Sequence, residues 1–322
     1  MALTDLPVTD LRGFRPEVAE PADFDAFWDL TLAEARQQPL DVVADKVDSG
    51  LRLVDVYDVR FAGFGGHRVK AWLTRPAGSV EDLPVVVEYQ GYGGGRGLAH
   101  ERLTWANAGY AHLFMDTRGQ GSSWGTGGTT PDPVGAGPSS PGFMTRGILD
   151  AADHYYRRVY TDGVRAVEAV LTRSETNPAK LAVVGGSQGG GIAIAVAGLE
   201  PAVKAAMPDV PFLSDFRRAV GLTTRDPYGE IVRYLAVHRE GAEKAYETLN
   251  YFDGIHFSAR AKMPGLFSTG LMDDVCPPST VYASFNAWAG SKEIEVYAFN
   301  NHEGGGVFQD RAQVAWLKKV LG

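Results

Sequence analysis

The sequence predicts an α/β protein with a mostly parallel central sheet and helices on both faces. From residue 84 onward, short apolar runs typical of buried strands alternate with helical patterns, the arrangement that produces parallel sheets. One such strand, at residues 181–184, leads into the glycine-rich turn 185–191 and then into a helical run at 192–197. The turn has the pattern Gly-x-Ser-x-Gly around Ser187. A strand, this turn and a helix in succession are typical of the α/β-hydrolase fold.

The N-terminal part of the chain precedes this alternation. Residues 1–40 are predicted to form a helical arm, because aromatic and aliphatic residues recur there at helical spacing. Two β-rich runs, 52–61 and 67–76, are separated by the glycine-rich segment 62–66 and predict an antiparallel hairpin. An antiparallel start followed by a parallel remainder fits the same fold.

From residue 84 onward, the apolar pattern and length of each run predict whether it forms a strand or a helix. Strands are expected at residues 84–89, 110–115, 181–184, 203–207, 265–269 and 293–299. Helices are expected at residues 98–108, 161–174 and 192–197, and after the last strand as far as Leu321.

Two segments interrupt the alternation. Residues 117–147 are dense in Gly, Pro, Ser and Thr, and a loop of that length inside a compact domain is usually functional or at an interface. Residues 212–262 are aromatic-rich and mostly helical, at a place between two strands where this fold commonly inserts a cap. We expect one α/β-hydrolase domain over residues 1–322, with 212–262 as its helical insertion.

Composition excludes several classes of function. The 322 residues carry a net charge of −8 and no Lys/Arg-rich block, which argues against nucleic acid and anionic membranes as partners. The only cysteine, Cys276, cannot form an intrachain disulfide or a Cys-rich zinc site, and is expected to be a small buried side chain. We expect no signal peptide, no membrane helix and a cytoplasmic location.

Ser187 is the candidate nucleophile, and it needs a general base and an orienting carboxylate. In this fold the acid follows a late strand and the histidine follows the last one. His302 lies in a glycine-rich loop directly after the strand expected at 293–299. Three aspartates remain open as the acid: Asp273 and Asp274 follow the 265–269 strand, and Asp209 follows the 203–207 strand. The alternative for Asp274 is a solvated or helix-capping charge, and for Asp209 a turn residue.

An oxyanion hole needs two preorganised N–H donors. One is expected from the backbone of Gln188, because it follows the nucleophile and begins a helix. The second is expected from the loop 90–95, where Tyr92 occupies the donor position. This loop is not a phosphate loop, because no lysine follows its glycines and the spacing differs.

Several motifs in order carry a resemblance to a known family. They read Phe-Met-Asp-Thr-Arg-Gly-Gln-Gly-Ser at 114–122, Gly-Gly-Ser-Gln-Gly-Gly-Gly at 185–191, Gly-Leu-Met-Asp at 270–273 with Cys-Pro-Pro at 276–278, and His-Glu at 302–303. The set resembles the acetyl xylan esterase and cephalosporin C deacetylase family, carbohydrate esterase family seven. Further matches stand at residues 27–28, 142–147 and 251–253.

The resemblance implies a serine esterase that removes acetyl groups from small esters such as acetylated xylo-oligosaccharides, other acetylated sugars and cephalosporin C. It implies Asp273 as the acid, oxyanion donors at the backbones of Tyr92 and Gln188, and a homohexamer built from dimers. Residues 124–141 depart from the family by being richer in glycine and poorer in aromatics.

The acyl pocket is expected to accept acetyl and little more. Tyr92, Phe212, Pro227 and Tyr228 are the candidate substrate-binding residues, since large aromatics near the site would leave little room for a longer chain. No metal or organic cofactor is expected. The alternatives are a general short-chain carboxylesterase, a non-catalytic binding scaffold, and a peptidase or lipase on the same fold.

Overall fold

A computed structural model describes residues 5–134 and 142–322. Within these residues the strands form one nine-stranded sheet in the order β1-β2-β3-β5-β4-β6-β7-β8-β9. Pairing is antiparallel from β1 to β2, β2 to β3 and β3 to β5, and parallel from β5 through β4 and β6 to β9. The predicted antiparallel start and parallel remainder are therefore confirmed, and with them the α/β fold.

The strands are β1 (Val43–Val47), β2 (Val54–Ala62), β3 (Arg68–Pro76), β4 (Leu83–Tyr89), β5 (Ala111–Met115), β6 (Thr176–Gly186), β7 (Ala205–Asp209), β8 (Gly265–Gly270) and β9 (Lys292–Tyr297). The α-helices are α1 (Val8–Leu11), α2 (Phe24–Arg36), α3 (Thr104–Asn107), α4 (Tyr155–Leu171), α5 (Gln188–Leu199), α6 (Phe216–Leu222), α7 (Tyr228–Val237), α8 (Ala242–Asn250), α9 (Gly254–Ser258), α10 (Pro278–Ala287) and α11 (Val307–Leu321). Short 3₁₀ turns lie at Phe64–Gly66 and Arg239–Gly241.

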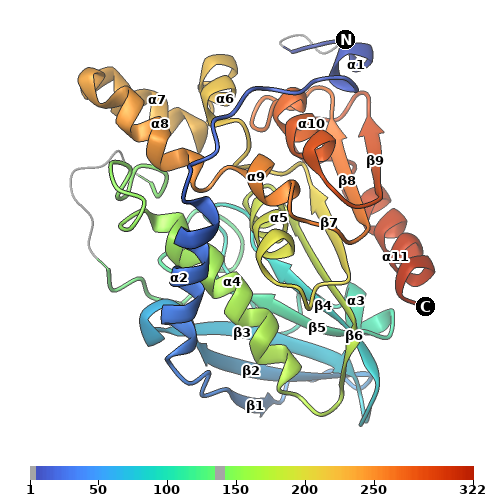
Figure 1. The fold of residues 1–322 in the computed structure, drawn as a ribbon. Helices are drawn as coiled ribbons and strands as arrows, with labels where there is room; N and C mark the ends of the chain where they lie inside the picture. The colour runs from blue at the N-terminus through green and yellow to red at the C-terminus, as the bar shows by residue number, and fades with distance from the viewer. Residues whose placement is uncertain (1–4, 135–141) are drawn as a thin grey trace.

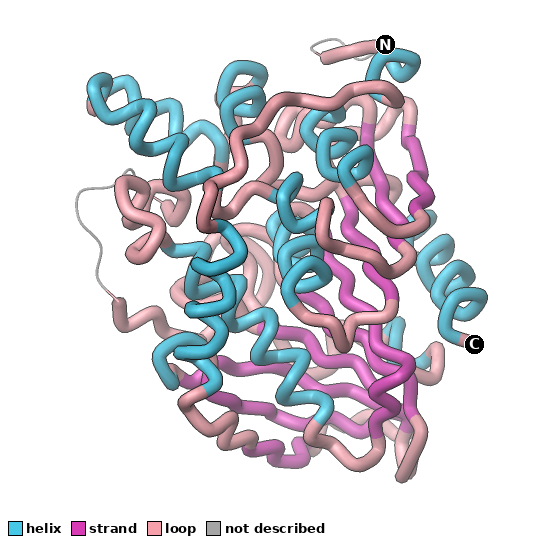
Figure 2. The backbone as a smooth tube through the Cα atoms, viewed as in Figure 1, coloured by secondary structure: helices cyan, strands magenta, loops and turns pink. Residues whose placement is uncertain are grey.

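Helices cover both faces of the sheet. Figure 1 shows α2, α4 and α5 lying across one face, and Figure 2 shows helices on both sides of the strands. Neighbouring residues of β4 explain this: Val85 and Val87 join the large core under α4 and α5, while Val86 joins a second core with Trp105 of α3 and Trp316 of α11. Because side chains alternate along a strand, a strand that is apolar at every position buries both faces.

Some elements differ from the prediction. The strand β1 was not predicted, because its side chains are half-buried or exposed and its residues lack a strong apolar alternation. The helix expected at 98–108 is only the single turn α3, and α4 begins at Tyr155 instead of 161. At its start His154 caps α4 by accepting from the N–H of Tyr156.

The segment 212–262 holds α6 to α9, as the helical prediction requires. Of the long loop expected at 117–147, residues 135–141 lie outside the described residues. Among residues 5–134 and 142–322, no helix is long and apolar enough to cross a membrane.

Candidate active site

Ser187 stands at a sharp turn between β6 and α5. Its φ of 56° and ψ of −119° are rare for a residue with a side chain, and such strain is typical of functional positions. The flanking glycines permit the turn: a Cβ on Gly185 would come 2.4 Å from the backbone of Gly189, and one on Gly189 would come 2.1 Å from the carbonyl oxygen of Tyr89. The backbone therefore presents the serine at the carboxyl edge of the sheet.

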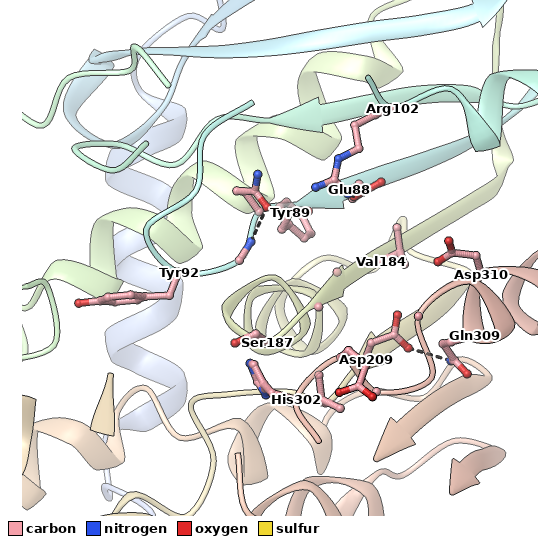
Figure 3. A pocket seen from close by; sticks show the side chains of 18 of the residues that line it. Glu88, Tyr89, Tyr92, Arg102, Val184, Ser187, Asp209, His302, Gln309 and Asp310 are labelled. Carbon is pink, nitrogen blue, oxygen red and sulfur yellow. Dashed lines mark hydrogen bonds and ion pairs between the residues drawn. The ribbon is translucent and has the colours of Figure 1, made fainter. Parts of the chain in front are cut away.

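His302 lies in the loop between β9 and α11, and Asp273 follows β8. Nδ1 of His302 is 2.8 Å from Oδ2 of Asp273, whose side chain is buried. The other carboxylate oxygen accepts the N–H groups of Val275 and Cys276, both at 2.8 Å. In Figure 3 the imidazole of His302 lies beside Ser187. The ring that contacts the Asp273 carboxylate therefore also lies next to the serine. These three hydrogen bonds fix the Asp273 carboxylate and, through it, the orientation of the histidine ring.

The other two aspartates have different partners. Asp209 accepts hydrogen bonds from the amides of Gln309 at 2.8 Å and Gln313 at 2.6 Å. Burial raises its pKa to about 7 despite these bonds. The side chain of Asp274 is half-exposed and pairs with Arg225 at 3.8 Å. Among the three candidates, Asp273 is the one whose carboxylate contacts His302.

A buried amide network joins the two segments predicted to carry the oxyanion donors. The side chain of Gln120 donates to Oε1 of Gln188 at 2.8 Å and accepts the N–H of Gly93 at 2.7 Å. Gln188 in turn donates to the carbonyl oxygen of Gln90 at 3.1 Å. These bonds hold both ends of the 90–93 loop against the start of α5, and so fix Tyr92 relative to Gln188.

Tyr92 is also held through its own side chain and carbonyl. Its hydroxyl donates to Oε1 of Glu230 at 2.5 Å and accepts the N–H of Phe143 at 2.6 Å. The indole N–H of Trp124 donates to the Tyr92 carbonyl oxygen at 2.7 Å. Glu230 accepts a second bond, from the N–H of Met144 at 3.0 Å, while burial raises the pKa of its carboxyl group.

A cavity of about 700 Å³ opens at Ser187 and His302. Of the four candidate substrate-binding residues, Tyr92 and Pro227 line it. Phe212 and Tyr228 do not line it: both are fully buried behind its wall, with ring centroids 4.4 Å apart. Their aromatic bulk therefore supports the wall of the cavity from within.

Figure 3 shows that the cavity continues away from the serine. Its far end holds Glu88, paired with Arg102 at 2.6 Å and with His112 at 3.0 Å. Partial burial of Glu88 acts to raise the pKa of its carboxyl group, but the hydrogen bond with His112 and the charge of Arg102 hold that pKa below its usual range.

Several contributors were not identified from the sequence. Glu230 lies within the helical insertion 212–262 and Trp124 within the loop rich in Gly, Pro, Ser and Thr, and neither residue stands in a local pattern that indicates a role. Gln120 belongs to a quoted motif, but its contacts depend on the fold. Cys276 is buried as expected, and burial strongly raises the pKa of its thiol. Among the described residues, no group of three or more His, Cys, Asp or Glu side chains is suited to hold a metal ion.

Comparison with known proteins gives consistent matches over nearly the full chain. A family model described as acetyl xylan esterase matches residues 1–320. Acetyl esterase Axe7A of Xylanibacter ruminicola is 30% identical over 316 residues, which cover 96% of this chain and 70% of that protein. The structure of an acetyl xylan esterase from a Paenibacillus species is 40% identical and superposes with a TM-score of 0.93, covering 98% of this chain and 100% of that one.

A second solved structure, acetyl xylan esterase 1 from a Thermoanaerobacterium species, is 31% identical with a TM-score of 0.90, covering 98% and 99% of the two chains. The acylaminoacyl peptidase of Pyrococcus horikoshii is 14% identical with a TM-score of 0.59, covering 85% of this chain and 42% of that one. At that identity the likeness concerns the fold alone.

Proposed function

The chain belongs to the acetyl xylan esterase family and is a carboxylic ester hydrolase, and we propose that it cleaves acetyl esters with Ser187 as nucleophile, His302 as general base and acid, and Asp273 as the residue that orients His302. One observation carries the proposal: Nδ1 of His302 lies 2.8 Å from a buried Asp273 carboxylate, with the ring beside Ser187. A histidine held in this way keeps its other nitrogen free for the serine proton.

The reaction then proceeds in two acyl transfers. The Ser187 oxygen attacks the ester carbonyl carbon while Nε2 of His302 takes the hydroxyl proton, and the carbonyl π electrons move onto oxygen. The backbone N–H groups of Tyr92 and Gln188 stabilise that oxyanion. Collapse expels the alcohol, which receives the proton from His302, and leaves acetyl-Ser187. Water repeats the sequence and releases acetate.

The acyl side of the site favours acetyl. Tyr92 forms part of the cavity wall, and Phe212 packs behind it with ring centroids 6.3 Å apart. Phe212 in turn packs edge-on against the buried ring of Tyr228. A longer acyl chain would have to displace these rings, and such overpacking typically costs about 1–3 kcal/mol. The cavity of about 700 Å³ leaves room on the alcohol side, which suits acetylated sugars and cephalosporin C.

The test compares kcat/KM for the p-nitrophenyl esters of acetate, butyrate and octanoate. We expect a steep fall from acetate to butyrate, because each added methylene must enter a packed wall. Equal or rising values with chain length would replace the proposal by the general short-chain carboxylesterase.

A fluorophosphonate probe separates an esterase from a binding scaffold. It labels only an activated serine, so we expect labelling of the wild type and none of Ser187→Ala. Absence of labelling in a folded wild-type protein would favour the scaffold.

The reaction as proposed needs no metal. Activity is therefore expected to survive exhaustive dialysis against EDTA, with the untreated enzyme as control. Loss of activity in EDTA with recovery on adding zinc would contradict this expectation.

A further inference from the structure

Trp124 is a large aromatic side chain left half-exposed at the catalytic cavity. Its residue is 49% exposed, and it lines the same cavity as Ser187 and His302. Tryptophan is usually highly buried, because its indole offers a large apolar area. A half-exposed indole in the wall of the cavity that holds the nucleophile therefore has a surface available for a ligand.

The loop beneath the indole is shaped to receive it. A Cβ on Gly94 would come 2.5 Å from Cζ2 of Trp124, and one on Gly91 would come 3.3 Å from the same atom. Neither glycine has a positive φ, so the approach of the ring, not the backbone conformation, demands glycine at position 94. Gly91 and Gly94 therefore present a backbone surface without side chains, against which the indole ring packs.

The single polar atom of the indole is already used. Its N–H donates to the carbonyl oxygen of Tyr92 at 2.7 Å, which fixes the ring in place. Ser123 ties the neighbouring backbone to the same loop, by an N–H bond to the carbonyl of Gly93 at 3.1 Å. One side of the indole packs on the backbone of Gly94, and its only hydrogen-bond donor is already used. The remaining surface of the ring can therefore offer a ligand only apolar contact.

We propose that Trp124 is the stacking platform for a pyranose ring in the alcohol part of the ester. One face of a pyranose presents C–H groups that pack on an aromatic ring, while its hydroxyls point outward. Carboxylates of Glu101, Asp226 and Glu303 line the same cavity and are acceptors for such hydroxyls. This inference rests on the proposed function, since it names the alcohol that the acetyl-transfer site receives.

The kinetic test uses two triacetates, one with a ring and one without: triacetylated methyl xylopyranoside and glycerol triacetate. The measured quantity is kcat/KM for the xylopyranoside triacetate divided by kcat/KM for glycerol triacetate. It is determined for the wild type, Trp124→Ala, Trp124→Phe and Leu98→Ala. Both Trp124 variants lose the bond to Tyr92, so any cost of that loss affects both substrates and cancels in the ratio. Leu98, 50% exposed and outside the cavity lining, controls for removal of surface apolar area.

We expect Trp124→Ala to lower the ratio by about tenfold, because it removes the ring, and Trp124→Phe to keep it within about threefold, because phenylalanine still offers an aromatic face. Leu98→Ala should leave it unchanged. An equal fall for both triacetates in Trp124→Ala would overturn the platform.

A binding measurement separates this inference from the proposed function. Calorimetric titration of Ser187→Ala with xylobiose needs no turnover, so it reports on the platform even if the wild type hydrolyses neither triacetate. We expect the Kd to rise about tenfold when Trp124→Ala is added. An unchanged Kd would overturn the platform, and a change of oligomeric state in Trp124→Ala, seen by light scattering, would assign the indole to subunit contact.

Discussion

Individual residues differ in how far their sequence context reveals them. Ser187 was predicted because its whole setting is local: a strand, two obligatory glycines and a helix within a few residues. For the acid, the local pattern left three aspartates open, and Asp273 was predicted only from the family resemblance, because adjacent aspartates look alike in the sequence and the fold decides which one faces the histidine. In the structure Asp273 points inward to His302, while Asp274 points outward to Arg225.

The acid assignment leads to a direct comparison of three variants. Asp273→Asn should lower kcat by roughly 10³–10⁴-fold, because an amide at that position favours the wrong histidine tautomer. Asp274→Asn and Asp209→Asn, whose carboxylates contact other partners, should stay within about threefold of wild type. Steady-state kinetics on p-nitrophenyl acetate measures this. A larger loss from either control than from Asp273→Asn would refute the assignment.

His154 should make stability depend on pH. It is fully buried at the start of α4, and burial lowers its pKa to about 3. Its unfolded pKa is about 6.5, so the unfolded state binds the proton first as the pH falls, and stability is lost from about pH 6.5 downward. From pH 7 to pH 5 the loss from this group is about 2 kcal/mol.

Urea unfolding at both pH values measures that loss. His154→Gln retains one acceptor and one donor but cannot titrate, so its stability should fall less between pH 7 and pH 5 than that of wild type. Identical pH dependence in the two proteins would contradict the assignment of the loss to His154.

At the scale of elements, strong periodicity was predictive and weak periodicity was not. The amphipathic α2 lies in the predicted arm and buries Phe24, Trp28 and Leu32. By contrast, β1 is held by its pairing with β2, and the pattern of its own side chains does not indicate a strand. The connection between α7 and the 90–95 loop was equally invisible, because Glu230 and Tyr92 are 138 residues apart.

The contact of α7 with Tyr92 predicts a role for Glu230 in positioning. Glu230→Gln loses an acceptor for either the Tyr92 hydroxyl or the N–H of Met144. The 90–95 loop, which carries the proposed oxyanion donor Tyr92, then becomes less well fixed. We expect kcat to fall by about tenfold with KM little changed, since the oxyanion donors act in the transition state. Glu243→Gln, an exposed glutamate on α8, is the matched control. Reduced stability without a change in the kcat of the folded protein would show a structural role only.

At the scale of the whole molecule, the order of strands and helices could be predicted because both faces of the parallel sheet need apolar residues. The cavity could not, since its walls come from β4, β5, β6, β7, α3, α11 and several loops that only folding brings together. Nor could assembly, because subunit contacts leave no local pattern in one chain. The homohexamer remains a prediction from family resemblance.

Light scattering coupled to size-exclusion chromatography tests the assembly. We expect a mass of about six times the 34.7 kDa chain at concentrations used for assays. A monomer of unchanged specific activity would show that neither the fold nor the site needs partner subunits.

The most direct test of the central claim is to trap the acyl-enzyme. The wild type is mixed with an acetyl ester, quenched in acid during turnover, digested and mapped by mass spectrometry. We predict an acetyl group on the Ser187 side chain, and none in Ser187→Ala, which should be inactive. Full activity of Ser187→Ala, or an acetyl group carried by a different residue whose removal abolishes turnover, would contradict the account.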